Sequence, residues 1–141
     1  MKHQISTTIT IHATVETVWN IFTKFEDYPN WNPFIKSIQG TIKVGESFQA
    51  TIGGMKFKPT TKVYAPNQEF TWLGRLFIPG IFDGRHSFLF QSNDDGSTTL
   101  IQKEGFSGIL VPFMKRKLDT EIKQGFEAMN EKLKELAEEK K

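Results

Sequence analysis

The chain has 141 residues, of which 38% are hydrophobic, 13% aromatic and 24% charged, and its formal net charge is +2. This composition is typical of one globular domain, which we place at residues 1–141, and it excludes a disordered or fibrous protein. The lack of cysteine excludes disulfides and thiol chemistry, and so small a net charge does not indicate nucleic-acid binding. With no run long enough to span a membrane and no apolar leader segment at its start, the sequence leads us to expect a cytoplasmic protein without stable membrane insertion.

Near residue 14 the spacing of the apolar residues changes from every second residue to every third or fourth, and this change predicts the first elements. Residues 4–12 alternate between an apolar and a polar side, which predicts a half-buried strand. Thr14 can cap a helix, and apolar side chains then recur every three or four residues as far as Phe25. Pro29 and Pro33 allow only a turn or one short helical turn after it. We therefore expect two short helices after the first strand.

Turns containing glycine or proline divide residues 35–106 into segments that we interpret as six consecutive strands. No connection is long enough for a crossover helix, so these strands and the first one predict a seven-stranded antiparallel sheet. In one predicted strand, alternate residues from Met55 to Val63 share one side, while Lys56, Lys58 and Lys62 share the other. We interpret these lysines as a solvated outer face that protects the sheet, rather than as a phosphate site.

Residues 112–138 predict a long helix with one apolar stripe. The stripe drifts as a 3.6-residue period requires, which argues against a coiled coil and predicts packing on the chain's own sheet. One helix about 10 Å wide cannot cover seven strands unless the sheet curves around it. The predicted fold is therefore α+β, a curved seven-stranded antiparallel sheet around a long C-terminal helix. The space between them suits an apolar cavity walled by large aromatic side chains.

Five segments together carry a resemblance to a known family. They are residues 11–19, YPNWNPF at 28–34, residues 71–75, PGIFDGRHSF at 79–88, and residues 104–108. Through them the chain resembles the START-like SRPBCC superfamily, and within it the polyketide cyclase/dehydrase-like group, from about residue 4 to 138. The resemblance implies the helix-grip fold and an apolar ligand pocket between the sheet and the C-terminal helix. It implies no single reaction, because the superfamily includes lipid carriers, hormone receptors, allergens and cyclases.

A predicted hairpin brings together the most distinctive polar pair. If residues 94–96 form a three-residue loop with Gly96 in the left-handed conformation, His86 lies opposite Glu104 on one face of the sheet. On a cavity wall this pair could orient a ligand carbonyl or transfer a proton, which makes both residues candidate catalytic groups. Alternatively, the two side chains only satisfy each other's hydrogen bonding. A two-residue loop would shift the register and separate them.

Several features in and around the apolar segments allow more than one interpretation. Arg75 and Arg85 flank the apolar segment 76–82, and they could bind a ligand carboxylate or remain solvated or paired with an acid such as Asp83. The segments 76–82 and 106–114 could gate the cavity, cap the core or form a dimer contact. The aromatic turn at 28–34 could line a portal or plug the core. Gly125 in the long helix could make room for a ligand or for an aromatic side chain from the sheet.

We expect the ligand-binding side chains to be mostly aromatic and to come from the sheet, the turn and the long helix. Because the three histidines are far apart in the sequence and no phosphate loop or catalytic motif is present, we predict no metal site and no cofactor. The predicted ligand-binding residues are Trp31, Phe34, Phe57, Trp72, Arg75, Phe82, Phe88, Phe90, Gln102, Phe106, Met114, Leu118 and Ile122.

Three functions fit this pattern. The favoured one is binding or transport of a small hydrophobic or amphipathic ligand. The second is a polyketide cyclase or dehydratase-like enzyme that uses His86 and Glu104 as an acid–base pair. The third is a regulator that binds a client protein through the apolar loops, which could equally form a homodimer.

Overall fold

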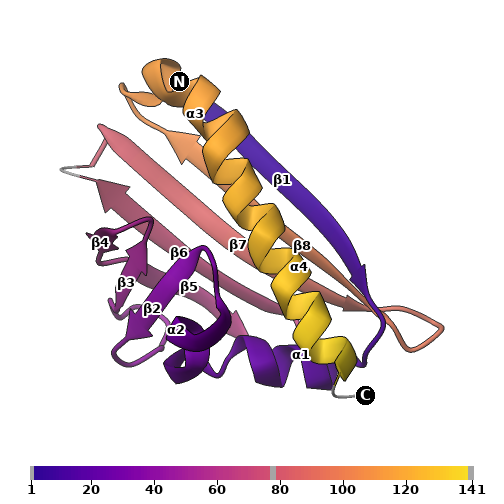
Figure 1. The fold of residues 1–141 in the computed structure, drawn as a ribbon. Helices are drawn as coiled ribbons and strands as arrows, with labels where there is room; N and C mark the ends of the chain where they lie inside the picture. Colours follow the sequence, from indigo (N-terminus) through magenta and orange to yellow (C-terminus); the bar gives the residue numbers. More distant parts are fainter. Residues whose placement is uncertain (1, 77–78, 140–141) are drawn as a thin grey trace.

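The computed structural model describes residues 2–76 and 79–139, and it folds as a curved sheet that holds a long helix (Figure 1). The N-terminal part consists of β1 (Lys2–Ile11), α1 (Val15–Phe22), a 3₁₀ turn η1 (Phe25–Asp27) and α2 (Tyr28–Trp31). The strands that follow are β2 (Ile35–Gln39), β3 (Gln49–Ile52), β4 (Met55–Phe57), β5 (Thr60–Ala65), β6 (Glu69–Leu76), β7 (Phe82–Ser92) and β8 (Thr98–Ser107). The last described elements are α3 (Val111–Lys117), a π-helical segment η2 (Leu118–Ile122) and α4 (Lys123–Glu139).

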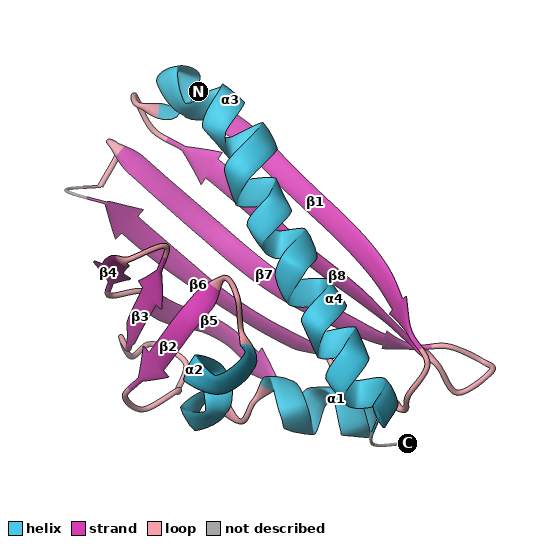
Figure 2. Ribbon diagram, in the orientation of Figure 1, coloured by secondary structure: helices cyan, strands magenta, loops and turns pink. Residues whose placement is uncertain are grey.

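The strands form two antiparallel sheets (Figure 2). The larger one has the order β1-β8-β7-β6-β5, and the smaller one has the order β2-β3-β4. The helix-grip fold is confirmed, but the strands lie in two sheets rather than in the single sheet predicted. The described residues also form eight strands rather than the predicted seven. The difference arises at Pro59, which separates β4 from β5 because proline has no N–H to donate to a ladder.

A β-bulge within β5 changes the face of the sheet to which its later side chains point. The register shifts between Thr61 and Val63, so Thr61 lies opposite Trp72, whereas Val63 lies opposite Thr71. Successive residues of β6 point to opposite faces, so Val63 is on the face opposite Thr61. The expectation that both share one side is therefore wrong.

The C-terminal helix lies across the concave side of the larger sheet (Figure 1). The predicted helix at 112–138 is observed over 111–139, with the unpredicted π segment within it. Its inward face is apolar and buried at Leu118, Phe126, Met129 and Leu133. This amphipathic face supplies the packing energy that holds the helix against the sheet. Among the described helices, none combines the length and the apolar character needed to cross a bilayer.

Aromatic side chains fill the space at the α1 end of the sheet. Thr14 caps α1 by accepting a hydrogen bond from the backbone N–H of Thr17 at 3.3 Å. The fully buried Phe22 of α1 packs against Phe88 and Phe90, with ring centroids 4.8 and 5.0 Å away, respectively. This end is therefore a solid core, and any hollow must lie toward α3.

Candidate functional site

A cavity of about 220 Å³ lies between the larger sheet, the small sheet and the segment from α3 to η2. His86 and Glu104 are both part of its wall. Of the residues predicted to contact a ligand, nine line it: Phe34, Phe57, Trp72, Arg75, Phe82, Phe106, Met114, Leu118 and Ile122. The structure thus brings most of the predicted site into one hollow.

Two paired glycines lie in the wall of the cavity, and Gly74 leaves space there. Gly74 of β6 lies directly opposite Gly84 of β7, and both line the cavity. They alternate with the inward-facing Trp72 and His86, so they occupy positions where core side chains would otherwise stand. A Cβ at Gly74 would meet its nearest neighbours, Gly84 O and Pro59 Cβ, only at 3.9 and 4.0 Å. The hollow is therefore space that neighbouring side chains leave unfilled.

Four predicted ligand contacts lie outside the cavity lining. Phe88 and Phe90 belong to the solid aromatic core beside α1, because the cavity lining includes β7 only as far as His86, two residues before Phe88. Gln102 is fully buried in a polar network beneath the cavity. Trp31 is buried against Tyr28, with centroids 5.2 Å apart, and borders a shallow surface groove instead. In the aromatic turn, Tyr28 and Trp31 thus plug the core, whereas Phe34 reaches the cavity.

The sequence prediction missed other lining residues, of which the glycines are the most informative. Period-two alternation from Trp72 and His86 would have placed Gly74 and Gly84 on the inner face, but a glycine offers no side chain to suggest a contact. Ile52, Met55, Pro59 and Lys117 also line the cavity without having been predicted.

Of the two arginines near the apolar segment, one lies beside an acidic side chain and the other is exposed to solvent. Arg75 lines the cavity, and its Nε lies 3.6 Å from Asp83 Oδ1. Arg85 is exposed on the face of β7 opposite His86. The pairing with Asp83 is the one that the sequence offered as the alternative to ligand binding.

The two apolar segments meet beside the cavity. The backbone N–H groups of Ile109 and Leu110 donate hydrogen bonds to the carbonyl oxygens of Gly80 and Ile81 at 3.1 and 3.0 Å. Residues 77 and 78 of the first segment lie outside the described residues. In the second segment, Ile109 and Phe113 are 66% and 83% exposed, and the gate, dimer and client contacts proposed for it stay predictions.

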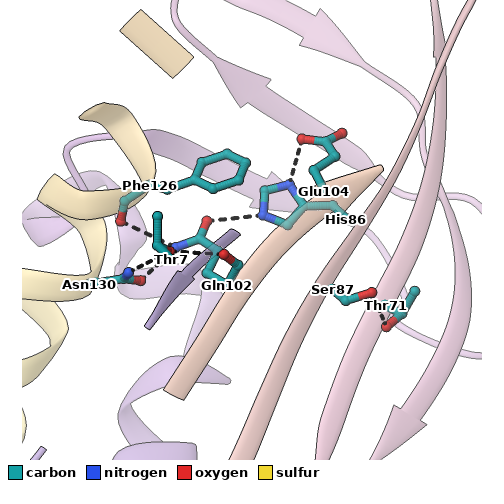
Figure 3. A network of polar contacts seen from close by, with 8 residues as sticks. All are labelled: Thr7, Thr71, His86, Ser87, Gln102, Glu104, Phe126 and Asn130. Atoms are coloured by element: carbon teal, nitrogen blue, oxygen red, sulfur yellow. Dashed lines mark hydrogen bonds and ion pairs between the residues drawn. The ribbon is translucent and has the colours of Figure 1, made fainter. Parts of the chain in front are cut away.

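The predicted hairpin register places His86 beside Glu104 (Figure 3). Asn93 donates its backbone N–H to Ser97 O at 2.8 Å, closing the three-residue loop, and Gly96 has a φ of 87°. His86 Nδ1 lies 3.2 Å from Glu104 Oε1. The His86 side chain is 1% exposed, whereas that of Glu104 is 14% exposed. The register prediction is confirmed.

A buried polar network holds the other side of the imidazole (Figure 3). His86 Nε2 lies 3.0 Å from Gln102 Oε1. Gln102 Nε2 donates to Asn130 Oδ1 at 2.7 Å and to the carbonyl oxygen of Phe126 at 3.3 Å. Asn130 Nδ2 donates to Thr7 Oγ1 at 2.9 Å, and Thr7 Oγ1 donates to Gln102 O at 2.8 Å. The network joins β1, β7, β8 and α4 and fixes the imidazole ring in place.

Glu104 has a different environment from His86. Its second oxygen, Oε2, lies over Gly84, where a Cβ would collide with it. Oε2 makes no hydrogen bond to any residue in the ranges 2–76 and 79–139, and both Glu104 and Gly84 belong to the cavity wall. This oxygen is therefore the polar atom of the pair that a ligand can reach.

The described residues contain no cluster of three or more histidine and carboxylate groups arranged to hold a metal ion. His3 pairs with Asp119 at 2.6 Å on the surface, far along the chain from His86. No described geometry indicates a resident metal.

The family model for polyketide cyclase/dehydrase and lipid transport proteins matches residues 2–138. The chain belongs to this family. Among curated proteins, none is significantly similar to it.

Solved structures with the same fold support the family membership. A START superfamily protein from Mycobacterium smegmatis is 22% identical with a TM-score of 0.74, the alignment covering 99% of both chains. The Zhui aromatase/cyclase from Streptomyces sp. R1128 is 11% identical with a TM-score of 0.76, over 98% of this chain and 94% of that one. A hypothetical protein from Helicobacter pylori is 12% identical with a TM-score of 0.83, over 96% and 88% of the two chains. At these identities the likeness concerns the fold alone.

Proposed function

We propose that this member of the polyketide cyclase/dehydrase and lipid transport family binds a small, mostly apolar ligand that carries one polar group. The observation that supports it best is the cavity of about 220 Å³ with the His86–Glu104 pair on its wall. An engineered apolar cavity of about 150 Å³ takes up benzene, so this volume suits a ligand of roughly one or two rings. The polar group would lie at Glu104, and the rings would lie against Trp72, Phe106 and Leu118.

A cavity-filling variant tests the proposal. A valine at Gly74 places methyl groups in the hollow, since its Cβ would have no neighbour closer than 3.9 Å. We expect Gly74→Val to weaken binding of a bicyclic probe, indan-1-ol, at least tenfold in isothermal titration calorimetry, with the folded state retained. Gly105→Val is the matched control, because Gly105 is exposed on the outer face of β8 with open space at its Cβ. Equal binding by wild type and Gly74→Val would place the ligand elsewhere and refute the proposal.

A second candidate is an enzyme of the cyclase or dehydratase kind. It is favoured by the 3.2 Å separation of His86 Nδ1 and Glu104 Oε1 beside the cavity, because one positioned acid–base group contributes about 10²- to 10⁴-fold to a rate. Native mass spectrometry of the purified protein would identify a retained ligand, which could then be tested for turnover. Turnover that survives in both His86→Gln and Glu104→Gln would reject this candidate while leaving the binding function intact.

A further inference from the structure

The hydrogen-bond network beneath the cavity fixes the orientation of the Gln102 side chain. The backbone carbonyl oxygen of Phe126 can only accept, so the amide group 3.3 Å from it must be the NH₂ end of Gln102. Asn130 agrees with this orientation. Its Nδ2 donates to Thr7 Oγ1, so its Oδ1 is the atom that accepts from Gln102 Nε2. The carbonyl end, Gln102 Oε1, is consequently the atom that faces His86.

This orientation fixes the proton on one imidazole nitrogen. Gln102 Oε1 can only accept, and it lies 3.0 Å from His86 Nε2, so Nε2 carries a hydrogen. The other nitrogen, Nδ1, lies 3.2 Å from Glu104 Oε1. A bare Nδ1 and an ionised carboxylate would repel each other at this distance, so the Nδ1–Oε1 contact holds a proton. That proton resides either on the ring, giving an ion pair, or on Oε1, giving a neutral pair.

In both arrangements Glu104 Oε2 has no hydrogen and can only accept. His86 Nε2 is hydrogen-bonded to Gln102 Oε1, and Nδ1 makes an ion-pair contact with Glu104 Oε1, so both ring nitrogens already face a polar partner. The other charged side chains of the lining, Arg75 and Lys117, are 47% and 56% exposed, and they lie 3.6 Å from Asp83 and 4.0 Å from Glu121, respectively. The polar atom that lies directly over Gly84, Glu104 Oε2, is therefore an acceptor.

We propose that the cavity selects ligands that donate a hydrogen bond, through a hydroxyl or N–H group, to Glu104 Oε2 and discriminates against the matching carbonyl compounds. This selectivity rests on the ligand-binding function proposed above. Gln102 acts as a positioning residue, because it determines which nitrogen of His86 is protonated. It thereby makes Glu104 Oε2 a hydrogen-bond acceptor. A carbonyl oxygen placed at Oε2 would leave two acceptors facing each other, whereas a hydroxyl satisfies both groups.

The matched probes are indan-1-ol and indan-1-one, which share a skeleton and differ in donor capacity. We expect wild type to bind the alcohol about tenfold more tightly than the ketone, because one hydrogen bond contributes about this factor to a binding constant. Glu104→Gln is the informative variant. With Nε2 protonated, the new NH₂ group donates to Nδ1, and its carbonyl oxygen faces the cavity, so the preference for the alcohol persists. Glu104→Leu removes the acceptor and should abolish the preference.

Two results would overturn the polarity inferred for Glu104. One is a Glu104→Gln variant that prefers indan-1-one, because its NH₂ group would then face the cavity. The other is a ¹⁵N NMR spectrum of the ligand-free protein in which His86 Nε2 lacks a proton. Equal binding of both probes by wild type would also overturn the selectivity but leave ligand binding standing. If neither probe binds wild type, the proposed function itself fails.

Discussion

The buried hydroxyl group of Tyr28 makes the stability of the folded state depend on pH. Its side chain is fully buried, and its hydroxyl donates a hydrogen bond to Phe22 O at 2.6 Å. Burial raises the pKa of Tyr28 well above its ordinary value, and the nearby Tyr64 adds to this shift. The folded state therefore binds the tyrosine proton more tightly than the unfolded chain does.

The sign of the resulting pH dependence follows directly. Stability from the protonated Tyr28 is fully present below the ordinary tyrosine pKa of about 10 and is lost as the pH rises above it, since only the unfolded chain then ionises. We expect Tyr28→Phe to cost about 1 kcal/mol at neutral pH and to flatten the alkaline loss of stability, measured by urea unfolding at a series of pH values. Tyr64→Phe is the control, because burial raises the pKa of Tyr64 by less. An unchanged alkaline slope in Tyr28→Phe would contradict the assignment.

At the scale of elements, Gly125 lets the C-terminal helix pack closely against its neighbour, because glycine has no side chain. A Cβ at Gly125 would collide with the ring of Phe34, which follows α2 and lines the cavity. Phe34 also packs against Phe126 of the same helix, with ring centroids 5.3 Å apart. The room at Gly125 thus serves an aromatic residue, as the sequence suggested, but one from the turn rather than from the sheet.

Gly125→Ala should therefore have an effect opposite to the usual one. In an exposed helix interior this substitution stabilises by about 1 kcal/mol, but here the new methyl group must displace Phe34. We expect Gly125→Ala to destabilise wild type and to stabilise a Phe34→Ala background, as measured by urea unfolding of all four proteins. Stabilisation by Gly125→Ala in both backgrounds would show that the ring does not occupy this space.

The sequence predicts the parts of this fold that depend on periodicity. The alternation in β1, the helical stripe of α4 and the hairpin that pairs His86 with Glu104 are all visible in the residues, because each follows from spacing along one segment. The division at Pro59 and the bulge after Thr61 depend on how strands pair across the sheet. The role of Gln102 also depends on tertiary structure, since its partner Asn130 is 28 residues away on another element.

At the scale of the molecule, the buried apolar side chains of the described residues form one cluster. It draws on β1, α1, the turn around Tyr28, both sheets and the C-terminal helix. The three tryptophans, Trp19, Trp31 and Trp72, all belong to it. A shared core of this kind supports the prediction of one domain over residues 1–141.

We therefore expect the chain to unfold in a single cooperative step. Far-UV circular dichroism follows mostly the helices, and tryptophan fluorescence follows the shared core, so the two urea transitions should coincide. A ligand in excess should raise both midpoints together, because it binds only the folded state. Separate transitions for the two signals would indicate that the helix and the sheet are independent units.

Gly74 of β6 and Gly84 of β7 face each other, and substitutions at these two positions would alter two different properties of the cavity, its size and its polarity. At position 74 each added methyl group would shrink the chamber while its chemistry stayed the same, because an added Cβ would meet its neighbours no closer than 3.9 Å. At position 84 even an alanine would push the Glu104 carboxylate aside, so that substitution would change which molecules are recognised. Two adjacent backbone positions could thus diversify a single scaffold, one by size and the other by polarity.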